Sequence, residues 1–316
     1  MTNTLLTGRE FNDLHPAVRQ RALKLRDNYT VVNGKAYDLE GEYLGDQFQH
    51  DLTPKKSEAQ VNAQQKFTSS KQVLGAHEEE NGGFVFTFFK QSHTINERFP
   101  SLNHADIARL MNLGTYTAWT TGRLQYDNGR VIDAEGFEKL TGLSTKRARE
   151  LFKRYVDEGI LSQQEGAIYM NHTVFYRGNV SEVKSDIVDM QYTRMFKKTV
   201  RDLYEQFNGR TVGQLALVYS LMPFLNFNFN IVCYNPDESD KDLVRPISLE
   251  HVAELIGYES PAKLKTALNR VKIGDKVVFN FFESTKDRRQ KHITVNPRVI
   301  YAGDGKHLDA IMVQFN

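Results

Sequence analysis

The sequence predicts a mainly α-helical chain with small β-hairpins, an α+β fold, and the main observation behind this prediction is a pattern that occurs twice. Residues 133–179 and residues 247–304 each read as a helix, a tight turn, a second helix and a β-hairpin. The two copies also end alike, in Asn171-His-Thr-Val-Phe-Tyr-Arg-Gly and Asn296-Pro-Arg-Val-Ile-Tyr-Ala-Gly. This order of elements is typical of a winged helix-turn-helix domain, and it suggests double-stranded DNA as a partner.

Composition limits the classes of protein that fit. At 316 residues the chain is long enough for two or three domains, and 41 Lys and Arg residues nearly balance 39 Asp and Glu residues. The net charge of +2 excludes a polybasic coat protein, so any affinity for nucleic acid has to come from local patches.

Secretion and membrane insertion are not indicated. Cys233 is the one cysteine, which excludes an intrachain disulfide, and the first residues lack the apolar core of a signal peptide. No apolar run approaches the roughly 20 residues that a membrane span needs. We therefore expect a soluble, cytoplasmic protein with no membrane partner.

Turn residues and apolar spacing divide the chain into five expected parts. Two of them lie outside the repeats: a small amino-terminal module with turns at Asn33-Gly34 and Glu40-Gly41, and a polar stretch that reads as a linker or a loosely held helix. The five expected parts are the helix and hairpin module at 1–52, the linker at 53–83, the first winged helix at 84–183, a connecting helix at 184–209 and the second winged helix at 210–316.

The first repeat opens with Phe84-Val-Phe-Thr-Phe-Phe, an aromatic run without interleaved basic residues, which favours a buried strand over a base-stacking surface. After a supporting helix within residues 103–119, Asp133 is expected to cap a helix, Gly142 to reverse the chain and Ser144 to cap a second helix. Gly159 should end that helix. The hairpin that follows, pinched at Glu165-Gly166, has no basic tip and is a poor clamp for phosphates.

The second repeat follows the same plan with a different distribution of charge. The supporting helix is expected at 211–222, Ser248 caps the first helix of the motif, and Ser260 followed by proline starts the second. Residues 226–233 alternate between Asn and apolar side chains, the period of a half-buried strand. The hairpin is about ten residues longer than in the first copy, and its tip is basic, which suits phosphates or the minor groove.

Basic residues on the second helix of each repeat are the candidate DNA contacts, because Arg and Lys at the amino-terminal end of such a helix suit entry into the major groove. A basic helix face can also be only a solvated face, and winged helices also serve as dimerisation or docking modules. The expected DNA-binding residues are Thr145, Lys146, Arg147, Arg149, Lys153 and Arg154 in the first repeat, and Lys263, Lys265, Arg270, Lys286, Arg288, Arg289 and Lys291 in the second.

The chain resembles the tandem winged-helix replication initiators and related regulators of plasmids and phages over residues 84–304. The resemblance rests on Leu140-Thr-Gly-Leu-Ser, Glu158-Gly-Ile-Leu, Val174-Phe-Tyr-Arg-Gly and their second-copy counterparts. It implies binding to repeated or palindromic DNA sites, a homodimer, and host replication or transcription machinery as a further partner. The expected function is sequence-specific DNA binding in regulation of transcription or initiation of replication, and the alternative is a protein adaptor that docks a host enzyme.

No motif for an enzyme, a cofactor or a metal emerges. The phosphate-loop spacing is missing, and Ala302-Gly-Asp-Gly-Lys-His lacks its hydroxyl. The histidines form neither a nickase pair nor a zinc motif, so His172 and His292 are expected to be structural or to face phosphates. The acidic run Asp237-Glu-Ser-Asp-Lys-Asp reads as a solvated loop. We therefore expect a protein that is not an enzyme and binds no cofactor.

Overall fold

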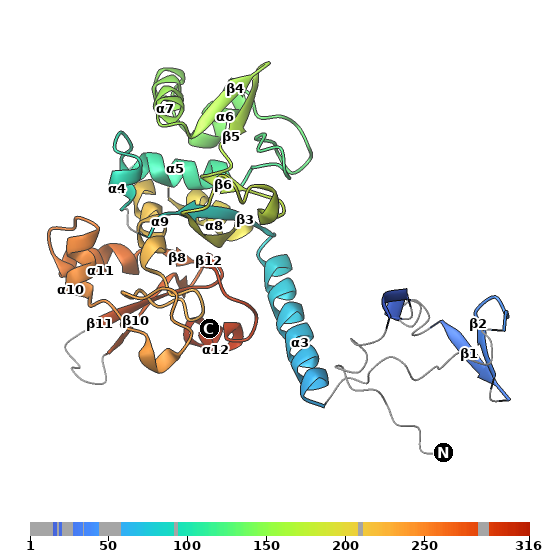
Figure 1. The fold of residues 1–316 in the computed structure, drawn as a ribbon. Coiled ribbons are helices and arrows are strands. Elements are labelled where there is room, and N and C mark those ends of the chain that lie inside the picture. Colours follow the sequence, from blue (N-terminus) through green and yellow to red (C-terminus); the bar gives the residue numbers. More distant parts are fainter. Residues whose placement is uncertain are drawn as a thin grey trace. The chain divides into compact units, whose positions relative to one another are not determined.

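The computed structural model describes residues 15–17, 19–20, 28–33, 35–43, 58–91, 94–207, 211–283 and 291–316. The chain divides into two compact units, residues 1–68 and residues 69–316, and both repeats lie in the second unit (Figure 1). Helices and small antiparallel sheets occur together, which confirms the α+β class. Within the described ranges, no helix is long and apolar enough to cross a membrane.

The first unit contains the predicted hairpin. Strand β1 (Tyr29–Val32) pairs antiparallel with β2 (Lys35–Asp38), and Asn33 adopts φ 49° in the turn between them. Gly41, with φ 85°, allows the second predicted turn, after which Tyr43 bridges back to Tyr37. Both turns occur where Asn-Gly and Glu-Gly pairs allow left-handed backbone.

The polar stretch forms helix α3 (Glu58–Glu80). Of the two alternatives, a linker or a helix, the helix is the one observed. The second unit begins at Ser69, and from there the helix has a packed side. Val73 and Leu74 contact an apolar cluster that includes Leu308, and the buried His77 hydrogen-bonds through Nε2 to the carbonyl oxygen of Pro297 at 2.9 Å. These few contacts supply the burial that the composition alone did not reveal.

A four-stranded antiparallel sheet lies at the centre of the second unit, in the order β12-β7-β3-β6. The aromatic run forms β3 (Phe84–Phe89), which is buried as predicted. The expected connecting helix at 184–209 is wrong in its first half, because β7 (Gln191–Phe196) is a strand and only α8 (Lys197–Gln206) is helical. Strand β7 lies between β3 and β12 (Ile300–Tyr301), which satisfy its backbone groups on both sides. Strand β6 (Phe175–Tyr176) completes the sheet.

The elements of the first repeat follow the predicted order of helix, turn, helix and hairpin. Glu165 and Gly166 have φ 49° and 81°, the left-handed pair that a tight hairpin turn requires. The elements are α4 (Ile95–Arg98), α5 (His104–Gly114), α6 (Ala134–Thr141), α7 (Thr145–Asp157), β4 (Leu161–Gln164), β5 (Ala167–Met170) and η1 (Val180–Glu182).

The second repeat has the same order with shorter helices and a longer hairpin region. Its supporting helix is split into a 3₁₀ turn and a short α-helix before Pro223. The elements are η2 (Val212–Leu215), α9 (Ala216–Leu221), η3 (Met222–Phe224), η4 (Lys241–Leu243), α10 (Leu249–Leu255), α11 (Pro261–Asn269), β8 (Lys272–Ile273), β9 (Lys276–Val277), β10 (Phe279–Glu283), β11 (Lys291–Val295), α12 (Leu308–Met312) and η5 (Val313–Phe315).

The two repeats share their backbone pairing as well as their element order. Thr117 bridges Leu124 in the first repeat, and Leu225 bridges Val232 in the second, each residue 108 positions later. The same shift relates Gly122 (φ 69°) to Asn230 (φ 52°), and each carbonyl oxygen accepts a hydrogen bond from the second hairpin strand. Asn230 is buried, and its left-handed backbone makes a turn. The expectation of one continuous strand over residues 226–233 is therefore wrong.

The closing motifs also match bond for bond. Asn171 and Asn296 each accept a hydrogen bond from a backbone N–H two residues later, at 2.9 and 3.0 Å. The carbonyl oxygens of Val174 and Val299 then accept from β3 and from the end of β7, respectively. The repeated Asn-x-x-Val pattern is thus a turn that leads the chain out of each hairpin and into the shared sheet.

A local two-fold axis relates the two halves of this sheet. Phe86 faces Tyr176 of β6, and Arg194 faces Tyr301 of β12, so Phe86 and Arg194 hold equivalent positions. In the β3–β7 ladder Phe86 is also the direct partner of Arg194. An element that pairs with its own equivalent lies on a symmetry axis, and the axis therefore passes between these two residues. One continuous apolar core joins both repeats across this axis.

Candidate nucleic-acid interface

Helices α6 and α7 of the first repeat are joined by a short turn, and local sequence signals set their limits. Asp133 caps α6 by accepting a hydrogen bond from the N–H of Gly136 at 2.9 Å. Gly142 ends it with φ 63°, and α7 begins after Ser144, whose side chain makes no capping bond. Because Ala148, Leu151 and Tyr155 are buried, the opposite side of α7 faces solvent.

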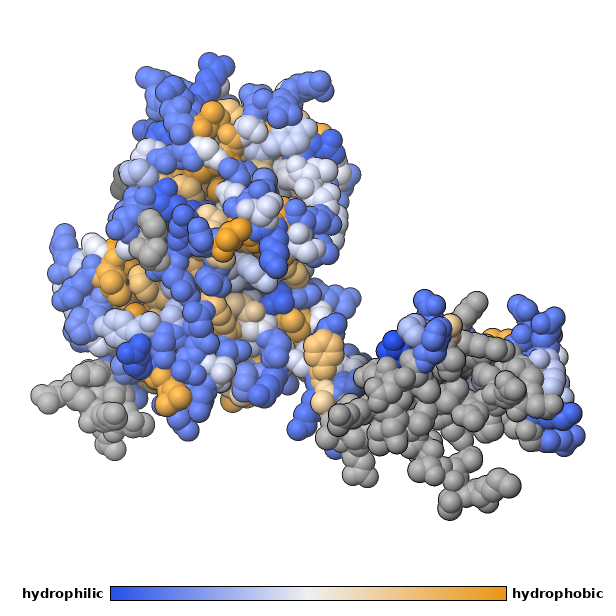
Figure 2. Space-filling view, in the orientation of Figure 1, coloured by the Kyte–Doolittle hydropathy of each residue, from blue (hydrophilic) through white to orange (hydrophobic). Residues whose placement is uncertain are grey.

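Three cations stand on the outward face of α7. Lys146, Arg147 and Arg149 are exposed, and no ion pair links them to any of the described residues. Hydrophilic residues cover this outer side of the molecule, while an apolar strip is visible between α7 and the β4–β5 hairpin (Figure 2). The arrangement provides cations at the start of an exposed helix, where they are available to phosphates or base edges.

The other predicted residues of α7 are already engaged. The Thr145 hydroxyl donates to Glu138 Oε1 at 2.8 Å, and Lys153 forms an exposed ion pair with Asp157 at 2.9 Å. Arg154 reaches back to α5, where its Nη2 lies 3.1 Å from Oδ2 of Asp106. That carboxylate is only 5% exposed, so Arg154 stabilises the packing of α7 on α5.

In the second repeat the cations on α11 have partners from their own chain. Lys263 pairs with Glu259 one turn earlier, and the ammonium group of Lys265 lies 5.7 Å from the centre of the Phe281 ring. Arg270 is exposed and has no ion pair within the described ranges. The face of α11 therefore offers fewer available cations than the face of α7.

The predicted basic wing falls mostly on residues about which the structure says nothing. Lys286, Arg288 and Arg289 lie outside the described residues, so their role stays a prediction. Lys291 pairs with Glu283 at 2.9 Å, at the end of the two strands nearest the tip. His292 lies in β11, and its buried ring hydrogen-bonds through Nδ1 to the carbonyl oxygen of Ile247 at 3.0 Å, which is a structural role.

The remaining titratable candidates have local roles. His172 Nε2 lies 2.7 Å from Asp186 Oδ2, next to the turn that follows β5. In the acidic run, Asp240 accepts a hydrogen bond from the N–H of Asp242 and starts η4. Cys233 is buried, and burial raises the pKa of its thiol to about 11. Among the residues placed by the structure, no group of acidic, His or Cys side chains could hold a metal ion.

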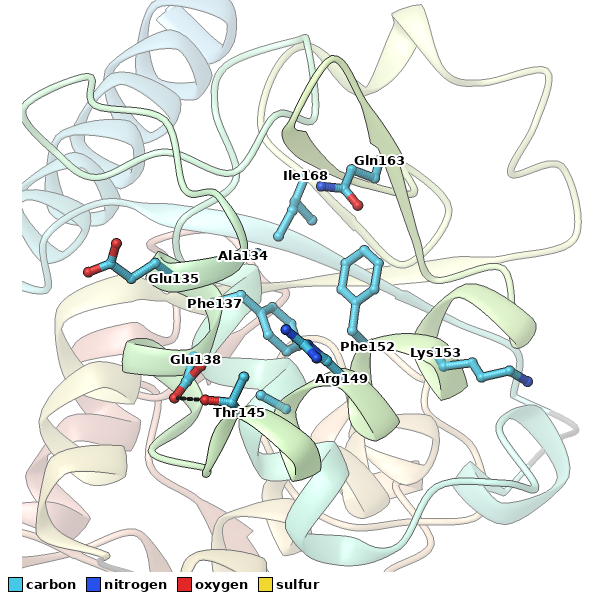
Figure 3. Close-up of a pocket in the computed structure, with 11 residues that line it drawn as sticks. Ala134, Glu135, Phe137, Glu138, Thr145, Arg149, Phe152, Lys153, Gln163 and Ile168 are labelled. Atoms are coloured by element: carbon cyan, nitrogen blue, oxygen red, sulfur yellow. Dashed lines mark hydrogen bonds between the residues drawn. The ribbon is translucent and has the colours of Figure 1, made fainter.

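A groove of about 400 Å³ lies between α6, α7 and the β4–β5 hairpin, and sequence reasoning did not predict it. Phe137, Phe152 and Ile168 provide its apolar lining, and Arg149, Glu138 and Gln163 add polar groups (Figure 3). We call it the first-repeat groove. Its signal in the sequence is Gln163, a polar residue at a position of the hairpin that faces the helices.

Comparisons with known proteins give no match to this chain. No protein-family model matches it, and neither a curated protein nor a solved structure shows significant similarity. The functional argument therefore rests on the geometry of the two repeats.

Proposed function

We propose that this protein binds double-stranded DNA sequence-specifically through two winged helices, each formed by a helix-turn-helix and its hairpin. The observation that carries the proposal is the outward face of α7, where Lys146, Arg147 and Arg149 are exposed without ion-pair partners among the described residues. A helix of 13 residues that packs by one face on α5 and α6 has the geometry of a recognition helix in the major groove.

The biological role that we propose is that of a phage or plasmid regulator of transcription or an initiator of replication. Supporting arguments are the two linked helix-turn-helix units and the resemblance stated above. We further propose a homodimer and contacts with host replication or transcription machinery. A footprint separates the two roles, because a promoter palindrome favours the regulator and direct repeats beside an AT-rich tract favour the initiator.

The DNA proposal is tested with duplexes selected from random sequence by the full chain. Replacing Lys146, Arg147 and Arg149 by Ala should lower affinity by at least about 100-fold and flatten the salt dependence, since each such contact contributes about 1–3 kcal/mol. The matched control removes three exposed lysines outside the motif, at Lys184, Lys198 and Lys306. If both triple variants bind DNA like the parent protein, α7 is not a recognition helix.

The second candidate function is a protein adaptor, and the first-repeat groove is the observation that favours it. An adaptor would bind its partner with a weak dependence on salt, because apolar contacts carry the affinity. DNA binding through cations weakens steeply as salt rises. A salt titration of each complex therefore distinguishes the two functions.

A further inference from the structure

We propose that the first-repeat groove is a docking site for an aromatic side chain presented by a protein partner. The proposal deepens the adaptor function and does not depend on DNA binding. Its basis is a comparison that the chain itself provides, because the second repeat shows what occupies the equivalent position.

The hairpin register establishes the equivalence. Gln163 pairs with Ile168 in β4–β5, and Phe281 pairs with Ile293 in β10–β11. Ile168 and Ile293 correspond, since each carbonyl oxygen accepts a hydrogen bond from the equivalent N–H, of Leu124 and of Val232 respectively. Gln163 therefore stands where the second repeat has Phe281.

The cations on the helices are equivalent as well. The inward residues Ala148 and Tyr155 of α7 match Leu264 of α11 and Val271, two residues beyond the end of α11, with one constant shift. The same shift places Arg149 at the position of Lys265. In the second repeat the Phe281 ring packs on the core beneath the ammonium group of Lys265.

The first repeat lacks a ring at this position of its hairpin, and by the same shift α7 carries Phe152 where α11 has Leu268. Phe137 and Phe152 meet edge to face, with ring centres 5.4 Å apart, and both line the groove together with Ile168. Arg149 also lines it and supplies the cation (Figure 3). Aromatic edges and a guanidinium group favour an aromatic occupant over an aliphatic one.

The size and the polar groups of the groove fit a side chain on a polypeptide. Its volume of about 400 Å³ is at the lower end of the range of about 300–1,000 Å³ typical of ligand pockets. Glu138 and Arg149 place an acceptor and a donor at the same opening, so the N–H and C=O groups next to an inserted ring would find partners. The occupant in the second repeat is likewise a side chain held by its own strand.

The test uses N-acetyl-4-fluorophenylalanine amide at millimolar concentration and follows its fluorine resonance in the presence of the full chain. The parent protein should broaden the resonance. Gln163→Phe, which places the ring of the second repeat into the first, should weaken binding about ten-fold or more, whereas Gln163→Ala should leave it in place. Circular dichroism shows whether each variant is folded.

Two further variants distinguish binding in the groove from non-specific binding. Arg149→Gln should weaken binding several-fold, while Arg147→Gln, two positions away and outside the groove, should not. The reciprocal change Phe281→Gln should create a second site in the other repeat. The proposal is overturned if the parent protein does not broaden the resonance, or if folded Gln163→Phe binds as well as Gln163→Ala. A DNA assay on the same variants reports separately on the proposed function.

Discussion

At the equivalent positions Arg149 and Lys265, the two repeats place a cation in different surroundings. Lys265 lies over Phe281, whereas Arg149 lines a groove and has no ion pair with a described residue. The cation two positions earlier shows the same contrast, since Lys263 is paired with Glu259 and Arg147 is exposed without an ion-pair partner among the residues placed by the structure. Cationic side chains that contact their own chain in the second repeat are thus available to partners in the first repeat.

The contrast in side chains exists on one backbone plan. Both repeats carry the same bridges, the same left-handed turn and the same Asn-led turn into the sheet. The same backbone arrangement therefore accommodates different surface side chains. It follows that matched substitutions in the two repeats should have similar effects on the fold and different effects on binding.

The largest expected effect concerns the shared sheet. Phe88 and Phe196 are equivalent and both are fully buried, so Phe88→Ala and Phe196→Ala should each lower the free energy of unfolding by about 3–5 kcal/mol. Because one core joins the repeats, either change should shift the unfolding of both together. Trp119 is the sole tryptophan and reports on the first repeat, while circular dichroism reports on the whole chain. Separate transitions by the two methods for Phe196→Ala would show that the repeats unfold independently.

A smaller effect is expected at the turn between the two helices of each motif. Gly142 and Gly257 have φ 63° and 75°, and a Cβ atom at either position would meet open space. Replacement by Ala should therefore cost only the backbone penalty, about 1–2 kcal/mol, and the cost should be the same in both repeats. Gly75→Ala in helix α3 is the control and should stabilise the chain by up to about 1 kcal/mol. Thermal or urea unfolding measures all three, and unequal costs would show that the turns differ.

The smallest expected effect is a pH dependence of stability at the contact between α3 and the second repeat. His77 of α3 is buried against Pro297, and this burial lowers the pKa of its imidazole. The folded state then binds the proton less readily than the unfolded state, so stability is full above the unfolded pKa of about 6.5 and falls as pH drops below it. Gln at position 77 keeps a donor for the carbonyl group of Pro297 and cannot titrate.

Urea unfolding at a series of pH values from neutral to mildly acidic tests this difference. His77→Gln should flatten the profile in part, because burial also lowers the pKa values of His104 and His307. An unchanged slope for His77→Gln would assign the effect to the other histidines.

Sequence reasoning succeeded where the pattern is local. The helix-turn-helix order, the turn at Glu165-Gly166, the caps at Asp133 and Ser248 and the buried aromatic strand all follow from spacing and turn chemistry. Strand β7 was missed because Phe196, Val200, Leu203 and Phe207 are spaced as in a helix, and that signal was extended backwards over residues whose strand partners lie far away in the chain.

The candidate site was predicted only in part for a similar reason. The outward direction of Lys146, Arg147 and Arg149 follows from helical periodicity and is confirmed. The partners of Arg154 and Lys265 depend on contacts with Asp106 and Phe281, which no local pattern contains. The first-repeat groove emerges only when the two hairpins are aligned by their hydrogen bonds.

The axis between Phe86 and Arg194 has one more consequence. In a dimer of identical chains, every residue on a two-fold axis meets its own copy, so a ring faces a ring or a charge faces a like charge. Here a phenylalanine faces an arginine, and the guanidinium group is free to donate to the carbonyl oxygens of Ala302 and Gly303 at 3.2 and 3.0 Å. Because one polypeptide contains both halves, the residues that meet between β3 and β7 need not be identical. A substitution in one half therefore does not require the same substitution in the other.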